Sequence, residues 1–137
     1  NTIEGHPNEL NPNKRPVHTI IPALLSKNNK LIGSFGVMGG QYQAAGHAYV
    51  LSQMIDFGLN PQLALNHPRI FPNNNVLDIE DDFDLNLINE LKSKGHKINY
   101  PVPPIGGVQM ILIHEEKDGT WTARSSSPRR SSPRSSR

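Results

Sequence analysis

The chain has 137 residues, enough for one modest domain, although its hydrophobic fraction of 35% is low for a compact one. Its formal net charge is +2, but five arginines lie after residue 123, and subtracting those five charges leaves the rest of the chain at −3. A slightly acidic body lacks the basic surface typical of nucleic-acid-binding proteins, so we expect no nucleic-acid partner.

Cysteine is absent, which excludes both a disulfide framework and thiolate chemistry. The compartment is therefore left open between the cytoplasm and an oxidising periplasmic or extracellular location. No signal peptide and no apolar run of bilayer length occurs, so we expect no membrane partner. Because the first residue is Asn1 and not Met, we expect a processed chain or a fragment.

The first part of the chain predicts an arm followed by a hairpin. Residues 1–16 are polar and contain three prolines, which favours an extended arm over regular structure. Apolar runs at residues 19–25 and 31–38 flank a turn-like stretch at 26–29, a pattern typical of two antiparallel strands. Pro22 indicates that the first of these strands is an edge strand or is bulged there.

Helical signals follow. Apolar residues recur at helical spacing over 46–57, and Gly58 suits the residue after the helix. Asn60 and Pro61 are a good helix-initiating pair, and the short helix 61–65 must stop before Pro68. After an asparagine-rich loop, residues 76–80 are predicted to form a strand. The next helix should begin at Asp81 and Asp82, as an acidic first turn, and end at Gly95.

The last elements complete a layered α/β prediction. Residues 108–114 read as a strand, joined by the turn Asp118-Gly119 to a partner at 120–122. From Ser125 onward only Ser, Pro and Arg occur, which cannot form a core. We therefore divide the chain into an extended arm (1–16), a partial domain (17–123) and a disordered tail (124–137), with strands and helices stacked in layers.

The stretch from Phe35 into the helix is the first candidate for chemistry. An apolar run ends in the pair Gly39-Gly40, and a helical pattern starts directly behind it. Glycine amides are not shielded by side chains, and a helix N-terminus adds unpaired N–H groups and a positive dipole end. Such a turn can bind a developing negative oxygen. An ordinary tight turn would give the same pair of glycines.

Several motifs share their order and spacing with one family. They are Gly5-His6-Pro7-Asn8, the stretch from Lys14 to Ala23 (KRPVHTIIPA), Gly39-Gly40, and the stretch from Asp56 to Arg69 (DFGLNPQLALNHPR). Together, over about residues 5–114, they resemble the C-terminal part of the small subunit of gamma-glutamyltranspeptidases, also called glutathione hydrolases. The resemblance implies an N-terminal nucleophile hydrolase with a four-layer αββα sandwich. This chain would supply part of that sandwich and lack the nucleophile strand.

The same resemblance implies the chemistry. In this family a threonine exposed by self-cleavage attacks the gamma-glutamyl carbonyl, and water or an amine then resolves the acyl-enzyme. That threonine should lie upstream of the motifs present here. Thr2 is a poor substitute, because the mechanism needs a free first residue and Thr2 follows Asn1. The upstream polypeptide, as the large subunit of the same precursor, is the implied partner in a heterodimer.

Four residues carry the implied site. Gly39 and Gly40 match the pair whose amides form the oxyanion hole, and His18 and Thr19 match the position of two serines that bind the glutamyl α-carboxylate. The His-Thr version is similar to the acylase-like branch of the family. Thr19 is equally well explained as a β-branched strand residue. At its end the chain departs from the family, because Ser126-Ser127-Pro128-Arg129 replaces a Ser-Asp-Pro-Arg segment.

Other polar residues have simpler explanations. The six histidines show no metal-ligand spacing, so we expect neither a metal nor another cofactor. His47 is expected to pack or cap, Arg69 to secure the loop after the short helix, and Arg15 either to pair with a carboxylate or to lie in solvent. Our first hypothesis is an amide hydrolase or acyltransferase fragment that is inactive alone. The alternative is a non-enzymatic binding protein that acts through its Ser/Arg tail.

Overall fold

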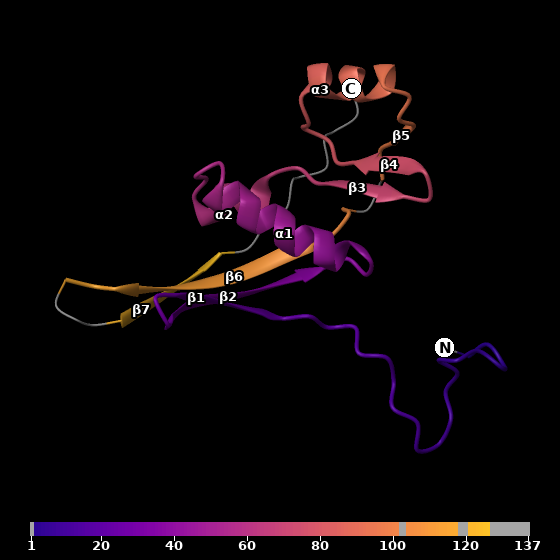
Figure 1. Ribbon diagram of the computed structural model, residues 1–137, viewed down its shortest axis with the longest axis horizontal. Helices are drawn as coiled ribbons and strands as arrows, with labels where there is room; N and C mark the ends of the chain where they lie inside the picture. The colour runs from indigo at the N-terminus through magenta and orange to yellow at the C-terminus, as the bar shows by residue number, and fades with distance from the viewer. Residues whose placement is uncertain (1, 102–103, 118–120, 127–137) are drawn as a thin grey trace, which may run out of the picture.

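The computed structural model describes residues 2–101, 104–117 and 121–126, which form two β-sheets and three helices (Figure 1). The larger sheet is antiparallel, with the strand order β1-β2-β6-β7. The smaller sheet has the order β3-β4-β5. The predicted layering of helices on sheets is confirmed, because α1 and α2 cover one face of the larger sheet and α3 lies beyond the smaller one (Figure 1).

The predicted first hairpin is confirmed, but its first strand is shorter than expected. Strands β1 (Ala23–Lys27) and β2 (Lys30–Met38) are joined by Asn28 and Asn29, whose φ values of +50° and +63° suit asparagine. The prediction that the strand begins at residue 19 is wrong, since pairing starts at Ala23 opposite Phe35. Pro22 has no N–H for a ladder, and β1 is indeed an edge strand, with a register shift after Leu25.

The first two helices follow the glycine turn. Helix α1 (Tyr42–Ile55) begins four residues earlier than the spacing predicted, directly behind Gly39-Gly40. Helix α2 (Pro61–Asn66) starts as predicted, with the Asn60 side chain accepting a hydrogen bond of 2.9 Å from the Leu63 N–H.

The smaller sheet contains one strand that was predicted and two that sequence patterns missed. Strand β4 (Val76–Ile79) confirms the strand expected at residues 76–80. It forms a second hairpin with β3 (Ile70–Asn73), which was not expected, through a positive-φ Asn-Asn turn. The two-residue strand β5 (Ile98–Asn99) pairs parallel to β4. The predicted start of the third helix is wrong as well. Asp82 has a φ of +76°, so α3 (Leu85–Ser93) begins only after Asp84, whose carboxylate accepts from the Asn86 N–H.

The final hairpin moves the expected domain boundary. Strand β6 (Gly107–Glu115) pairs with β7 (Trp121–Ser126), and the predicted turn at Asp118-Gly119 lies outside the described residues. Arg124, Ser125 and Ser126 were assigned to a disordered tail, which is wrong because they pair with Leu112, Ile111 and Met110. Ladder hydrogen bonds use the backbone, so this pairing does not require apolar side chains. Residues 127–137 lie outside the described part of the chain.

The two faces of the larger sheet differ. The face under α1 and α2 holds the core, a set of buried apolar side chains: Phe35, Val37, Tyr42, Val50, Leu65, Val108 and Met110. Along each strand the alternate side chains point to the opposite face, which carries no helix in the described chain (Figure 1). On that face Leu24, Met38 and Ile111 are 74%, 57% and 46% exposed.

In the described part of the chain, none of the helices has the length and apolar character needed to cross a membrane.

Candidate functional site

The glycine pair forms a turn between the end of β2 and the start of α1. Gly39 has a φ of +136° and Gly40 a φ of +58°, both in the region that favours glycine. A Cβ on Gly39 would lie 2.6 Å from the Ile105 carbonyl oxygen, so a larger residue cannot fit without moving backbone. A Cβ on Gly40 would meet no atom within 4 Å. Gly39 is therefore required by space and conformation, whereas at Gly40 the backbone conformation alone favours glycine.

Peptide planarity fixes where the two glycine N–H groups point. The Gly39 carbonyl accepts a hydrogen bond of 3.1 Å from the Tyr42 N–H in α1. In a trans peptide the N–H of the next residue points the opposite way, so the Gly40 N–H faces away from α1. The Met38 carbonyl lies against Gly106, and the Gly39 N–H accordingly faces away from the β6 side. Outside the helices and sheet ladders, the described hydrogen bonds use these glycines as acceptors and not as donors.

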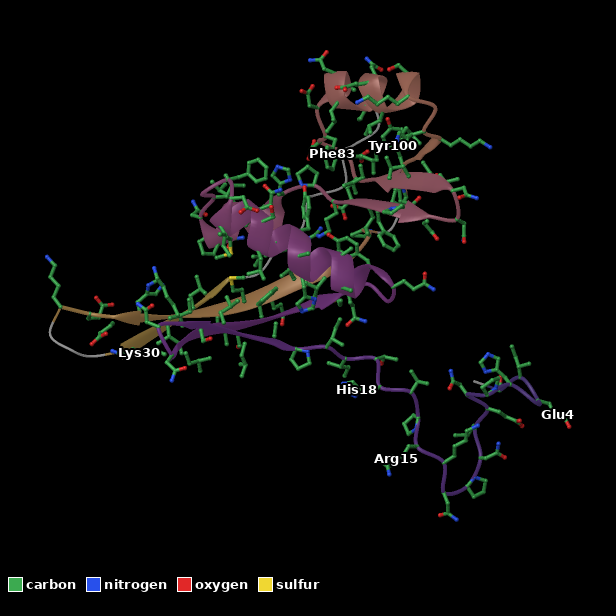
Figure 2. All side chains as sticks on the ribbon, viewed as in Figure 1. Glu4, Arg15, His18, Lys30, Phe83 and Tyr100 are labelled. Carbon is green, nitrogen blue, oxygen red and sulfur yellow. The ribbon has the colours of Figure 1, made fainter. Side chains whose placement is uncertain are left out.

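A cavity of about 1010 Å³ adjoins this turn. In the structure the arm continues without regular secondary structure to residue 22, directly before β1, and is called the arm (residues 1–22) below. Residues of this arm, β1, β2, the turn, α1 and β6 line the cavity: Thr19–Leu24, Ser34–Gly40, Gln43 and Gln109–Ile111. Thr19 thus lines the same cavity as both glycines. His18 does not line it and is exposed on the arm, as is Arg15 (Figure 2). Thr2 is exposed near the start of the arm.

Gln43 connects the two halves of this site, and sequence patterns did not single it out. Its side-chain nitrogen donates 2.9 Å to the Thr19 carbonyl and 3.1 Å to the Gly40 carbonyl. The first partner lies 24 residues away in the chain, which no local pattern can indicate. The only local signal was a polar amide in the first turn of the helix behind the glycine pair.

A buried ion pair holds the residue that packs against Gly39. Arg69 lies 3.1 Å from the Glu80 carboxylate, with side chains only 9% and 15% exposed. Glu80 also accepts a hydrogen bond of 2.9 Å from the Ile105 N–H, and Ile105 is the residue whose carbonyl abuts Gly39. Arg69 donates 3.1 Å to the Leu65 carbonyl, which confirms the prediction that it secures the loop after α2.

The buried rings around the site are structural. Tyr42 is 1% exposed, and its hydroxyl has no hydrogen-bond partner among the described residues. Burial raises the pKa of Tyr42 to about 12, and burial likewise raises the pKa of Tyr49 to about 12. Both phenols therefore stay neutral at physiological pH. The His47 ring lies 4.9 Å from the Phe35 ring, and its Nδ1 is 2.7 Å from the Gln43 carbonyl oxygen, as predicted for a packing residue.

In the described part of the chain, no group of three or more His, Asp or Glu side chains is arranged to hold a metal ion. The polar groups that line the cavity are backbone N–H and carbonyl groups, the side-chain amides of Gln43 and Gln109, and the hydroxyls of Thr19 and Ser34. Such groups can stabilise negative charge and orient a substrate. Among the residues that the structure describes, no His, Asp, Glu or Lys side chain lines the cavity as a base for the hydroxyls, which are weak nucleophiles without one.

Comparison with known proteins shows which family the chain matches. Residues 1–135 match the family model described as gamma-glutamyltranspeptidase. The chain is 31% identical over 128 residues to the glutathione hydrolase proenzyme of Bacillus subtilis, covering 93% of this chain but 22% of that protein. Two solved structures superimpose well. The cephalosporin acylase of Bacillus halodurans is 39% identical with a TM-score of 0.72, over 91% of this chain and 23% of the acylase chain.

The second structure is a T380A mutant of the Helicobacter pylori gamma-glutamyltranspeptidase. It is 26% identical with a TM-score of 0.77, over 94% of this chain and 70% of that chain. The present chain therefore spans less than a quarter of the length of the curated relatives that it matches.

Proposed function

Because the chain belongs to the gamma-glutamyltranspeptidase family, we propose that it supplies the oxyanion hole and part of the acyl pocket of an N-terminal nucleophile amide hydrolase or acyltransferase. The observation that carries this proposal is the Gly39-Gly40 turn, which lines the cavity and directs the Gly40 N–H away from α1. Donors fixed in advance stabilise a tetrahedral oxyanion without reorganising during the reaction.

The nucleophile in this proposal comes from polypeptide upstream of the chain. A threonine with a free α-amine would attack the acyl carbonyl, and the carbonyl oxygen would gain negative charge beside Gly39 and Gly40. The apolar face of the larger sheet supports such a partner. Leu24, Met38 and Ile111 are exposed there and also line the cavity, so a second sheet packed face to face would remove them from water and cover the cavity.

The substrate is proposed to be a gamma-glutamyl amide or a related acyl amide. Thr19 and the glycine turn share the cavity, so an acyl chain extending from the oxyanion site would run along the arm. His18 and Thr19 are retained as proposed substrate-binding residues. His18 is exposed on the arm, so substrate or the upstream polypeptide would have to approach the arm to contact it (Figure 2). The described residues offer no observation that favours the alternative of a binding protein acting through its tail.

Complementation tests this proposal. We would assay release of p-nitroaniline from gamma-glutamyl and from glutaryl p-nitroanilide by the chain alone, by the upstream polypeptide alone and by the two co-expressed. We expect turnover only from the co-expressed pair. Replacing the terminal threonine of the upstream polypeptide by alanine is the matched control. Robust turnover by the 137-residue chain alone, or none with either substrate by a complex that forms, would refute the proposal.

A further inference from the structure

We propose that Gln43 is a positioning residue that fastens the arm segment carrying Thr19 to the glycine turn, and that this link sets the affinity for the acyl substrate. The inference rests on the proposed function, because the arm and the turn are taken as two walls of one pocket. It concerns a residue that contributes no group to the oxyanion hole itself.

The contact uses the full donor capacity of one side-chain nitrogen. The Gln43 amide nitrogen carries two hydrogens, and two carbonyl oxygens lie within hydrogen-bonding distance, at 2.9 Å for Thr19 and 3.1 Å for Gly40. Since carbonyl oxygens only accept, the amide must present its nitrogen to both and not its oxygen. One planar group therefore joins the arm to the turn.

Gln43 itself is held firmly. It lies in the first turn of α1, and its backbone N–H donates 3.2 Å to the Gly40 carbonyl. Its own carbonyl oxygen lies 2.7 Å from His47 Nδ1, one helical turn further along. A positioning side chain acts best from a rigid element whose orientation is fixed by neighbouring contacts. The link therefore restrains the arm relative to the helix, and not the reverse.

The two acceptors depend on Gln43 to different degrees. The Gly40 carbonyl has a second donor in the Gln43 backbone N–H, so the turn keeps one hydrogen bond when the side chain is altered. For the Thr19 carbonyl, the described hydrogen-bond donor is the Gln43 side chain. Residues 19–22 precede β1 and have no ladder partners among the described residues. Loss of the side-chain amide should therefore free the arm and leave the oxyanion turn largely in place.

Kinetics of the complemented enzyme test this difference. Gln43→Met keeps the length and shape of the side chain but has no donor, whereas Gln43→Lys keeps N–H donors. Gln41→Met is the matched control, because Gln41 is exposed, lies two residues away and makes no side-chain capping bond. We expect Gln43→Met to raise KM about five- to thirtyfold, as loss of one or two hydrogen bonds implies. We expect kcat of Gln43→Met to change by less than about threefold. Gln43→Lys should return KM most of the way to the wild-type value, and Gln41→Met should have the KM and kcat of wild type.

A second measurement keeps this inference separate from the proposed function. Backbone ¹⁵N relaxation on the full chain measures the order of the arm. In wild type and in Gln41→Met, Thr19, Ile20 and Ile21 should be more ordered than residues 11–17. In Gln43→Met, the same three residues should be as mobile as residues 11–17. If the wild-type complex has no turnover, the proposed function fails, while the relaxation data still decide whether Gln43 holds the arm. Unchanged arm order in Gln43→Met, or a fall in kcat with unchanged KM, would overturn the inference.

Discussion

The two glycines of the turn should respond very differently to the same substitution. In Gly39→Ala the new Cβ would stand 2.6 Å from the Ile105 carbonyl oxygen and 3.2 Å from the Gly106 Cα, at a φ of +136°. A strained backbone costs about 1–3 kcal/mol, and forcing extra atoms into a packed site costs about 1–3 kcal/mol more. The free energy of unfolding should therefore fall by about 2–6 kcal/mol, or the turn must shift.

Gly40→Ala meets no neighbouring atom within 4 Å, and its φ of +58° lies in the left-handed helical region. The substitution should lower the free energy of unfolding only through the strained backbone conformation, by about 1–2 kcal/mol. Asparagine tolerates this region, as Asn28, Asn29, Asn74 and Asn75 show in this chain. Gly40→Asn should therefore cost less than Gly40→Ala.

Urea unfolding of the full chain, followed by circular dichroism, would measure this series. The midpoint should fall in the order wild type, Gly40→Asn, Gly40→Ala, Gly39→Ala, with a constant m value, because the surface exposed on unfolding does not change. Equal losses for the two alanine variants would refute the claim that Ile105 crowds Gly39. A larger loss for asparagine than for alanine at position 40 would refute the assigned backbone conformation.

Three further predictions concern the surroundings of the site. Removing Arg69 leaves the Glu80 carboxylate buried without its partner, so Arg69→Met should lower the free energy of unfolding, measured in urea, by about 3–5 kcal/mol. The loss should be smaller when Arg69→Met is combined with Glu80→Gln. An Arg69→Met variant as stable as wild type would contradict this. Burial in the folded chain raises the pKa of Tyr42 from 10.0 to about 12. As the pH rises, the unfolded chain loses this proton first, so the free energy of unfolding should fall between pH 10 and 12. Tyr42→Phe should reduce this alkaline loss and, because the hydroxyl lacks a partner among the described residues, cost little at pH 7; an unchanged pH profile would count against it. Asn60→Ala should cost about 0.5–2 kcal/mol through loss of the α2 cap, measured by the same unfolding assay, and Asn60→Asp, which keeps a capping oxygen, should not.

Tertiary contacts explain most differences between prediction and structure. β5 has two residues and pairs with β4, about twenty positions earlier in the chain, so no periodicity could reveal it. Residues 124–126 join a sheet through backbone pairing, although their composition is typical of disorder. The helix predicted from Asp81 starts later because Asp82 takes a left-handed conformation.

Sequence by itself determined the local features of this protein. The Asn28-Asn29 turn, the Asn60-Pro61 helix start and a glycine pair between strand and helix each depend on the backbone preferences of a few adjacent residues, and the motifs placed the chain in its family. Only the tertiary structure decided what surrounds the glycine pair. Ile105 lies behind Gly39, Glu80 holds Ile105, and Gln43 reaches back to Thr19. These contacts join residues far apart in the chain, and their geometry exists only once the sheets and helices have packed.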